Sequence, residues 1–417
     1  MGLEKGRRPL VLAAAVLLAA VVSGAVAWRV LAPAEVSTPA RGGYPPAPTA
    51  APGVVARLPV APLIVDGRLR VYAGDRQVYA DRPVDGRHRT TPYWSYRRWP
   101  ASLQGVVASG TTVVSRWSDG RLVGLDARTG RVAWRADGPE PVGERTARRT
   151  GAATVWEPRG LFVTEPAGGR PVVVAVGRGG AVAVDPDAGT ALWRTDVDPD
   201  CRDAIGTTAD GRLVTVDTCA GPAAVEFIDV RTGTAGSRWR PPGAPGELVV
   251  TLVGCRAGRS DCAGLRTAGP GDDAGQGWLL GDAAPAAAPA LDAPGAELAG
   301  EVAVAVTDGA LVGRSARTGA ERWRRGDLGQ ARVVAVQPGR VHLLTPANDL
   351  VTVDPATGVQ RSWFTLNIGS DGVGWVPGEV YAEAGFVAVE RLRRPVDPQG
   401  DDQRYFYNSE PVIVAAT

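Results

Sequence analysis

The chain is poor in the side chains that most often transfer protons or bind transition metals. Its 417 residues include two histidines, His88 and His342, and four cysteines, no two of which are adjacent. A zinc site needs closely spaced cysteines, usually with histidine support, and this sequence does not supply them. The apolar segment 341–344 around His342 is typical of a strand, and we expect His88 in a solvated loop. The composition therefore predicts no metal centre.

An excess of charge of either sign is also lacking. The chain has 46 lysines and arginines against 44 acidic residues, a formal net charge of +2, and Lys5 is its one lysine. This balance excludes the basic surface that nucleic-acid binding requires. Asp196, Asp198 and Asp200 have the spacing of the first ligands of a calcium loop. The sixth position is cysteine instead of glycine and the twelfth is threonine instead of glutamate, so we expect a polar loop there.

What the sequence does contain is a repeated turn of the form small-x-Asp-x-x-Thr-Gly, followed within a few residues by tryptophan. The aspartate can accept backbone N–H groups two residues on, and the glycine supplies the positive φ of a tight hairpin. The tryptophan that follows has a large area to bury and one N–H to satisfy. The repeat residues are Asp126, Gly130 and Trp134; Asp185, Gly189 and Trp193; Asp229, Gly233 and Trp239; Gly275 and Trp278 in a degenerate copy; Gly319 and Trp323; and Asp354, Gly358 and Trp363.

The spacing of these turns predicts the fold. From Gly189 onward the turn glycines recur roughly every 40–45 residues, the length of one four-stranded propeller blade. We therefore expect an all-β chain, a β-propeller of seven blades in which each tryptophan wedges neighbouring blades together. An eighth blade follows if residues 69–79 form a partial blade of their own. The last blade would combine three C-terminal strands with residues 93–98, which removes two open sheet edges.

The N-terminus predicts a membrane anchor. Lys5, Arg7 and Arg8 precede an uncharged apolar run at residues 10–28, which is about long enough to span the roughly 30 Å hydrocarbon layer as a helix. The basic flank would stay in the cytoplasm, which places the remainder outside it. The alternative is a cleaved signal peptide, because Ala25-Val26-Ala27 resembles a cleavage site. We expect a cytoplasmic tip and transmembrane signal anchor at 1–31, a Pro/Ala-rich spacer at 32–62 and the propeller at 63–417.

An extracytoplasmic location also bears on the cysteines. An even number of cysteines outside the cytoplasm favours disulfides, and four cysteines allow three connectivities. We expect Cys201–Cys219 and Cys255–Cys262, because each pair lies within the length of one blade.

The repeat, preceded in its clearest copy by Asp-Gly-Arg-Leu-Val at 119–123, resembles that of the PQQ-like (quinoprotein-type) propellers over residues 93–417. That family includes catalytic alcohol dehydrogenases and non-catalytic relatives, among them the propeller lipoprotein of the outer-membrane assembly machinery. In the catalytic members a quinone lies on a tryptophan floor beneath a disulfide of adjacent cysteines, with a bound calcium ion. This chain has no adjacent cysteines, and its tryptophans match outer-strand positions. The resemblance thus implies the non-catalytic, membrane-anchored branch, with no cofactor and no catalytic residue.

The resulting hypothesis is a membrane-tethered scaffold or protein-interaction module of the cell envelope. Its propeller would be monomeric, and it would bind an envelope protein or a cell-wall component. Residues 139–151 form a long insert between repeats that could supply the contact loop. Two alternatives stay open: a quinone- and calcium-dependent sugar or alcohol dehydrogenase, since sugar-type quinoproteins also lack the disulfide, and a small-ligand sensor that uses the central channel.

Overall fold

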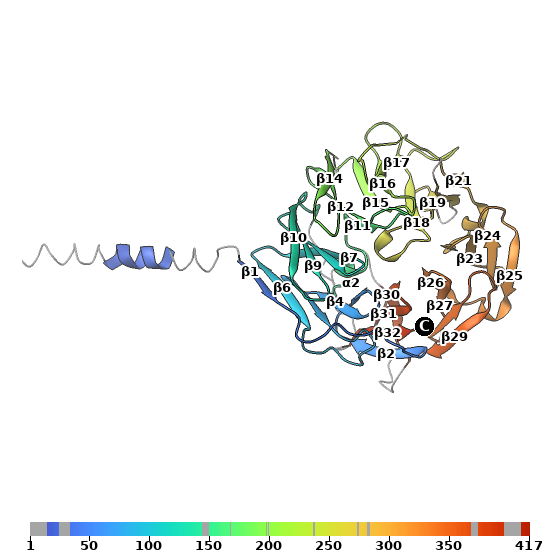
Figure 1. The fold of residues 1–417 in the computed structure, drawn as a ribbon. Coiled ribbons are helices and arrows are strands. Elements are labelled where there is room, and N and C mark those ends of the chain that lie inside the picture. The colour runs from blue at the N-terminus through green and yellow to red at the C-terminus, as the bar shows by residue number, and fades with distance from the viewer. Residues whose placement is uncertain are drawn as a thin grey trace, which may run out of the picture.

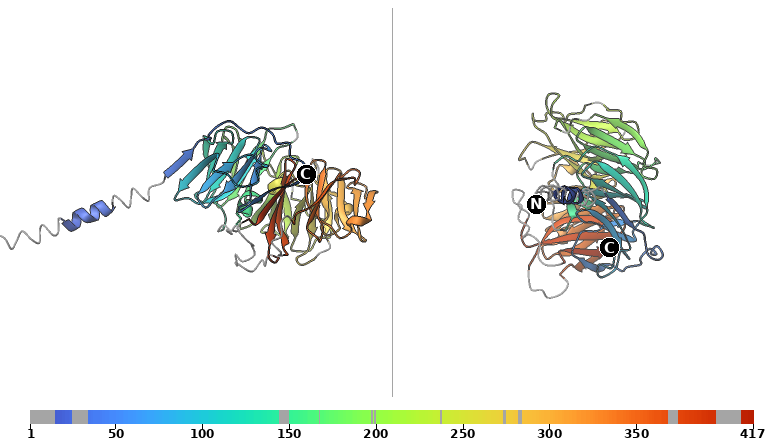
Figure 2. Two further views of the ribbon diagram at one scale, coloured as in Figure 1. Left: turned by 90° about the horizontal axis from the view of Figure 1, so that it is seen from below. Right: turned by 90° about the vertical axis from the view of Figure 1, so that its left-hand side faces the viewer.

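The described strands form eight sheets arranged radially around one axis, which is a β-propeller of eight blades (Figure 1). The protein is represented by a computed structural model. It describes residues 15–24, 34–143, 150–166, 168–196, 198, 200–236, 238–272, 275–281, 284–367, 374–395 and 410–417. The blades lie side by side around the ring, which Figure 2 shows edge-on. The all-β propeller expected from the repeat is confirmed, and the expected number of seven blades is wrong.

We number the blades in chain order, and within each blade the strands are antiparallel to their neighbours. Blade 1 has five strands, blade 4 has three and the others have four. The first four blades contain β1 (Ala34–Thr38), β3 (Leu63–Val65), β4 (Leu69–Ala73), β5 (Gln77–Asp81) and β6 (Trp94–Trp99); β7 (Leu103–Ser109), β8 (Thr112–Trp117), β9 (Arg121–Asp126) and β10 (Val132–Asp137); β11 (Leu161–Thr164), β12 (Val172–Gly177), β13 (Gly180–Val184) and β14 (Ala191–Thr195); and β15 (Arg202–Thr207), β16 (Arg212–Asp217) and β17 (Ala224–Asp229).

The second half of the ring follows the same plan. Blades 5 to 8 contain β18 (Val249–Val253), β19 (Gly264–Ala268), β20 (Gln276–Leu279) and β21 (Ala286–Ala287); β22 (Glu297–Ala299), β23 (Val302–Thr307), β24 (Ala310–Ser315) and β25 (Glu321–Arg325); β26 (Arg332–Gln337), β27 (Arg340–Leu344), β28 (Asp349–Val353) and β29 (Gln360–Thr365); and β30 (Val376–Glu383), β31 (Phe386–Leu392), β32 (Val412–Ala416) and β2 (Gly53–Leu58). Short helices link some strands: α2 (Ala152–Val155), η1 (Ala257–Arg259), η2 (Pro289–Leu291) and η3 (Gly326–Leu328).

The ring closes by pairing strands from both ends of the chain, as expected, but with a different N-terminal strand. β2 pairs with β32 from Gly53 opposite Ala416 to Leu58 opposite Val412, and Figure 1 shows β2 beside β32. The segment 93–98, expected to close the last blade, belongs to β6 in blade 1. Residues 69–79, the condition for an eighth blade, lie in β4 and β5 of that same blade.

The segment 32–62, expected to be a spacer, contains two strands of the propeller. β1 pairs with β6 along its whole length as the outermost strand of blade 1, and β2 completes blade 8. Proline and alanine set the composition of this segment, but the short segments 35–38 and 53–56, each with two β-branched residues, can still pair at sheet edges. The propeller therefore starts before residue 63.

Residues 10–14 and 25–28 of the N-terminal apolar run lie outside the described residues. Residues 15–24 are helical. Within the ranges given above, no helix has both the length and the apolar composition that crossing a membrane requires.

The core lies between blades, because each sheet is covered on both faces. β13 is buried throughout, as are all residues of β12, and both are rich in valine, which suits a strand with two covered faces. The apolar clusters accordingly join neighbouring blades. One of them brings Val107 and Val114 of blade 2 against Leu161 and Val182 of blade 3.

The repeat turns have the geometry that their residues favour. In the clearest copy the Asp126 carboxylate accepts a hydrogen bond from the Arg128 N–H at 2.8 Å, and the Gly130 N–H donates to the Asp126 carbonyl at 2.7 Å. Asp185, Asp229 and Asp354 make the same contacts with the backbone two residues on. The glycines of these turns and Gly319 have φ near +70°, where a side chain would be strained; Gly275 of the degenerate copy is not among the glycines with positive φ.

Four tryptophans lock one blade to the next in the same way. Trp134 of blade 2 donates its indole N–H to the Pro186 carbonyl of blade 3 at 2.7 Å. Its ring lies against Gly189, where a β-carbon would come within 2.5 Å of it. Trp193 and Trp323 dock identically on Gly233 and Gly358. Trp94, which was not assigned to the repeat, docks on Gly130.

The other repeat tryptophans lie differently. Trp239 meets Trp278 of the next blade edge-to-face at 5.0 Å. Trp278 is in β20, and Gly275 lies just before that strand, so this copy does not form the turn into an outer strand as expected. Trp363 is 42% exposed, because blade 8 takes its outer strand from the N-terminal region and has no β32–β2 turn to cover it.

Candidate functional site at the propeller axis

A disulfide-closed hairpin from blade 5 reaches the axis of the ring. It comprises residues 255–262 between β18 and β19, and Cys255 is bonded to Cys262. The hairpin contains η1, and its Arg256 N–H donates to the Ser260 carbonyl at 2.7 Å. We call this segment the axial hairpin. The second disulfide joins Cys201 and Cys219 within blade 4, so both pairs are those expected from the sequence.

The axial hairpin is held by the neighbouring blade 4 and by blade 3, which is not adjacent to its own. Asp261 accepts hydrogen bonds from the Thr164 hydroxyl at 2.7 Å and the Glu165 N–H at 3.0 Å, both at the end of β11 in blade 3. The Cys262 N–H donates to the Thr207 carbonyl of blade 4 at 2.9 Å. These bonds fix the hairpin across the centre of the ring.

Charged side chains continue this attachment. Arg256 forms ion pairs with Glu165 at 2.8 Å and Asp261 at 3.3 Å, and it lies 3.9 Å from Glu383 of blade 8. Partial burial opposes the charge of Arg256, but the hydrogen bond to Glu165 and the nearby carboxylates outweigh it and raise its pKa. Burial also raises the pKa of Glu383, against the opposing effect of Arg256. The carboxylates at this point of the axis therefore already surround a cation.

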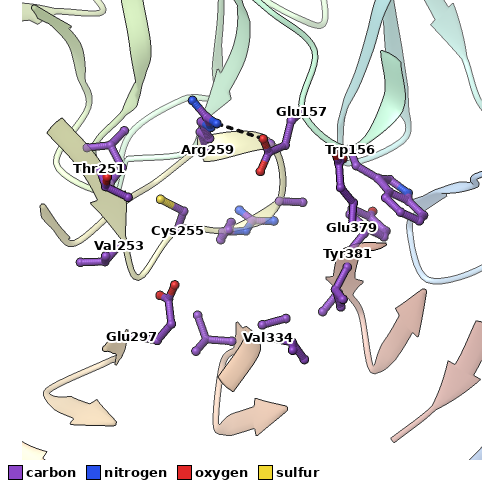
Figure 3. Close-up of a pocket in the computed structure, with 18 of the residues that line it drawn as sticks. Trp156, Glu157, Thr251, Val253, Cys255, Arg259, Glu297, Val334, Glu379 and Tyr381 are labelled. Carbon is purple, nitrogen blue, oxygen red and sulfur yellow. Dashed lines mark hydrogen bonds and ion pairs between the residues drawn. The ribbon is translucent and has the colours of Figure 1, made fainter. Parts of the chain in front are cut away.

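A cavity of about 390 Å³ lies beside the axial hairpin (Figure 3). Strands of several blades wall it, among them β18, β26 and β30, and the hairpin forms another side. Glu157, which lines it, pairs with Arg259 of the hairpin at 3.1 Å. A smaller cavity of about 240 Å³ shares Arg256, Ala257, Gly258 and Tyr381 with the first. The axial hairpin thus separates two spaces along the axis.

One tryptophan does lie at the axis, contrary to the sequence expectation. Trp156, directly after α2, lines the larger cavity, is 2% exposed, and donates its indole N–H to the Pro62 carbonyl at 2.8 Å. Tyr381 stacks on its ring at 5.7 Å, with an angle of 3° between the ring planes. Trp156 lies outside the repeat, so the sequence contained no pattern that placed it at the axis.

These residues do not fit the quinone and calcium of the catalytic relatives. A flat quinone needs an open aromatic face, and the ring of Trp156 is covered by Tyr381 and almost wholly buried. The cysteines at the axis are separated in sequence and close a hairpin instead of lying beneath a ring. Glu165, Asp261 and Glu383 face the guanidinium of Arg256, which takes the place that a metal ion would need.

His342 is a buried strand residue, as expected. It lies in β27, fully buried, with Nδ1 3.0 Å from the Thr352 hydroxyl and Nε2 3.2 Å from the Gln337 amide nitrogen. Burial, with a smaller contribution from Arg340, lowers its pKa to about 3. His88 is in an exposed bend, and its carbonyl accepts a bond from Arg70.

This burial predicts an acid-dependent loss of stability. The unfolded chain takes up a proton at His342 below a pH of about 6.5, whereas the folded chain does not until about pH 3. The free energy of unfolding should therefore fall by about 2–3 kcal/mol from this residue between pH 7 and pH 4.5. Urea unfolding at both pH values should show a smaller difference in His342→Gln than in the unmodified protein. His88→Gln, the exposed control, should leave the difference unchanged; an unchanged difference in His342→Gln would contradict the assignment.

The acidic segment at 196–200 and the insert at 139–151 were the two other candidate features of the sequence. Asp198 accepts a hydrogen bond from the Asp200 N–H at 3.0 Å, which is a turn contact. Across the described part of the chain, no three acidic, histidine or cysteine side chains come together as metal ligands would. Of the insert at 139–151, residues 144–149 lie outside the described residues.

Fold, repeat turns and docked indoles together define a PQQ-like β-propeller. A family model described as outer membrane protein assembly factor BamB matches residues 3–165 and 149–384. Because these matches span most of the sequence, the chain belongs to this family.

Known proteins give the following comparisons. No curated protein matches the sequence. BamB from Moraxella catarrhalis is 11% identical, with 91% of this chain and 99% of that chain covered and a TM-score of 0.43. The quinohemoprotein alcohol dehydrogenase from Comamonas testosteroni is 14% identical, with 87% and 74% covered and a TM-score of 0.40.

Proposed function

We propose that this protein is a non-catalytic, membrane-tethered propeller that binds a protein or cell-wall partner outside the cytoplasm. The observation that carries this proposal is the axial hairpin. Its disulfide, its backbone bonds to blades 3 and 4 and the ion pairs of Arg256 use the polar groups at the centre of the ring for structure. Family membership supports the same proposal, since the matching model is described as an assembly factor.

The outer rim of blade 7 offers a surface for such a partner. Val359 is 62% exposed and Trp363 is 42% exposed, four residues apart in and beside β29. Exposed tryptophans are common anchors of protein interfaces, and Val359 adds apolar surface beside Trp363. In the docked copies of the repeat, the turn of the next blade covers the indole. The indole of Trp363 is not covered in this way, so its ring remains free to contact a partner.

Site-specific crosslinking in intact cells tests the partner. A photo-reactive phenylalanine at position 363 should give a discrete adduct that Val359→Asp abolishes. The same probe at Leu192, which is 44% exposed on β14 of blade 3, serves as the matched control and should give none. The absence of a discrete adduct from position 363, or equal adducts from both positions, would count against binding at this rim.

A separate assay tests the non-catalytic role. Dye reduction by the purified protein after addition of the quinone and calcium would contradict that role.

The single lysine allows a direct test of the membrane anchor. Lys5 and the N-terminal amine are the only primary amines in the sequence, and both would face the cytoplasm if residues 10–28 remain as an uncleaved anchor. A membrane-impermeant amine reagent should therefore label the protein only after the cells are permeabilised. Labelling of intact cells would show instead that cleavage has exposed a new N-terminus outside.

A further inference from the structure

Glu297 is a carboxylate of the larger axial cavity that has no matching cation among the described residues. Glu297 begins β22 in blade 6 and lines the cavity, and Figure 3 shows its carboxylate turned toward the cavity. One of its oxygens accepts a hydrogen bond from the Gly254 N–H at 3.2 Å. Among the residues that the structure describes, Glu297 takes part in no ion pair. A charge in such a position is stable only when it is paired or when the group binds a proton.

The two arginines that line the same cavity are already engaged. Arg259 pairs with Glu157 at 3.1 Å. Arg256 turns to the opposite side of the hairpin, where Glu165, Asp261 and Glu383 surround it. Burial raises the pKa of Glu297, and the N–H groups of Gly254 and Leu298 and the charge of Arg266 only partly oppose this effect. The chain therefore supplies no cation for Glu297 in its charged form, and a cation from outside could pair with it.

The remaining wall combines apolar and polar side chains. Its apolar part includes Val250, Leu252, Val334, Val380 and the ring of Tyr381, and Thr251 and Glu379 also line it. The volume of about 390 Å³ is within the usual range for small-molecule sites. Thr251 and Arg259 line the cavity and are exposed, so it opens to solvent. A carboxylate set in an aliphatic and aromatic wall matches a molecule with one positive group and an apolar body.

We propose that this cavity binds a small organic ammonium ion, whose charged group pairs with Glu297 and whose apolar part packs against the valines of β18 and β26. An anion would find both arginines occupied and would meet the Glu297 carboxylate. A neutral apolar molecule would leave that carboxylate unpaired. A bare metal ion requires several oxygen ligands, which the valine walls do not provide. This binding activity goes beyond the scaffold role and does not depend on it.

Calorimetric titration of the purified full chain tests the proposal with three probes of similar shape. 2-Phenylethylamine should bind saturably and at least about tenfold more tightly than 2-phenylethanol, because only the amine carries a charge that can pair with the half-buried Glu297 carboxylate. 3-Phenylpropanoate should not bind. Equal affinities for the amine and the alcohol, or binding of the anion, would overturn the proposal.

Two variants locate the site. Glu297→Gln keeps the size of the side chain and should weaken amine binding at least about tenfold with the alcohol unaffected. The control is Glu301→Gln, at an exposed carboxylate 3.9 Å from Arg322, and this variant should bind the amine normally.

Val334→Phe should fill the cavity and abolish binding of amine and alcohol alike. Undiminished amine binding in Glu297→Gln or in Val334→Phe would refute the site. Should Glu297→Gln fail to fold, Val334→Phe alone decides the location, and the crosslinking at position 363 stays a separate test of the scaffold role.

Discussion

Replacing Trp134 with alanine should lower the free energy of unfolding by about 3–5 kcal/mol, the usual cost of removing a large buried aromatic side chain. Trp134 is 8% exposed. Its ring fills the space between blades 2 and 3 over Gly189, and its N–H satisfies the Pro186 carbonyl at 2.7 Å. The substitution removes the packing and leaves a buried carbonyl without its donor. Urea unfolding followed by circular dichroism measures the change.

Trp363 provides a matched control from the same position of the repeat. It is 42% exposed and has no turn of a following blade against its ring, so Trp363→Ala should cost less than about 1 kcal/mol. The comparison separates the effect of docking from that of losing any tryptophan on an outer strand. Similar losses in both variants would contradict the role assigned to the turn glycines.

A second large effect is expected at the buried ion pair of blade 1. Arg70 and Asp81 are fully buried and joined by two hydrogen bonds, at 2.7 and 2.8 Å. Asp81 also accepts bonds from the Tyr72 hydroxyl at 3.1 Å and the Thr90 N–H at 2.9 Å. Asp81→Ala should cost about 3–5 kcal/mol, because it leaves the Arg70 charge buried without its partner.

Two further variants distinguish the loss of the pair from the loss of a charge. Arg70→Met combined with Asp81→Leu removes both charges and should recover much of the stability that Asp81→Ala loses. Asp137→Ala removes a carboxylate that is 78% exposed and pairs with Arg121 at 3.0 Å, and it should cost less than about 1 kcal/mol. All can be compared by urea unfolding at neutral pH. A double variant less stable than Asp81→Ala would refute the explanation.

The repeat made the architecture predictable, because each copy contains both the residues that form its turn and the tryptophan that contacts the next blade. The number of blades was harder to obtain. Blade 1 has no Asp-x-x-Thr-Gly turn of its own, and its strand β6, which corresponds to the outer strand of the other blades, is recognisable only by Trp94. The rule that an indole covers the turn glycine of the next blade leads back from Gly130 to Trp94.

The axial site was less accessible to the sequence. The positions of Cys255 and Cys262 favour a local disulfide, but nothing in their spacing tells whether the hairpin lies on the rim or at the centre. Trp156 and Glu297 lie outside the repeat motif and approach each other only because different blades meet at the axis. Contacts between distant parts of a ring depend on its closure, which no local pattern encodes.

The axial hairpin also affects how the ring comes apart. When blades contact only their neighbours, stability is a sum of local terms and one blade can open while the others remain folded. Here blade 5 is fastened across the centre to blades 3, 4 and 8 through Asp261, Cys262 and Arg256. Opening blade 3 or blade 8 therefore breaks contacts with a blade that is not its neighbour. We expect blades 3, 4, 5 and 8 to unfold more cooperatively than blades that contact only their neighbours.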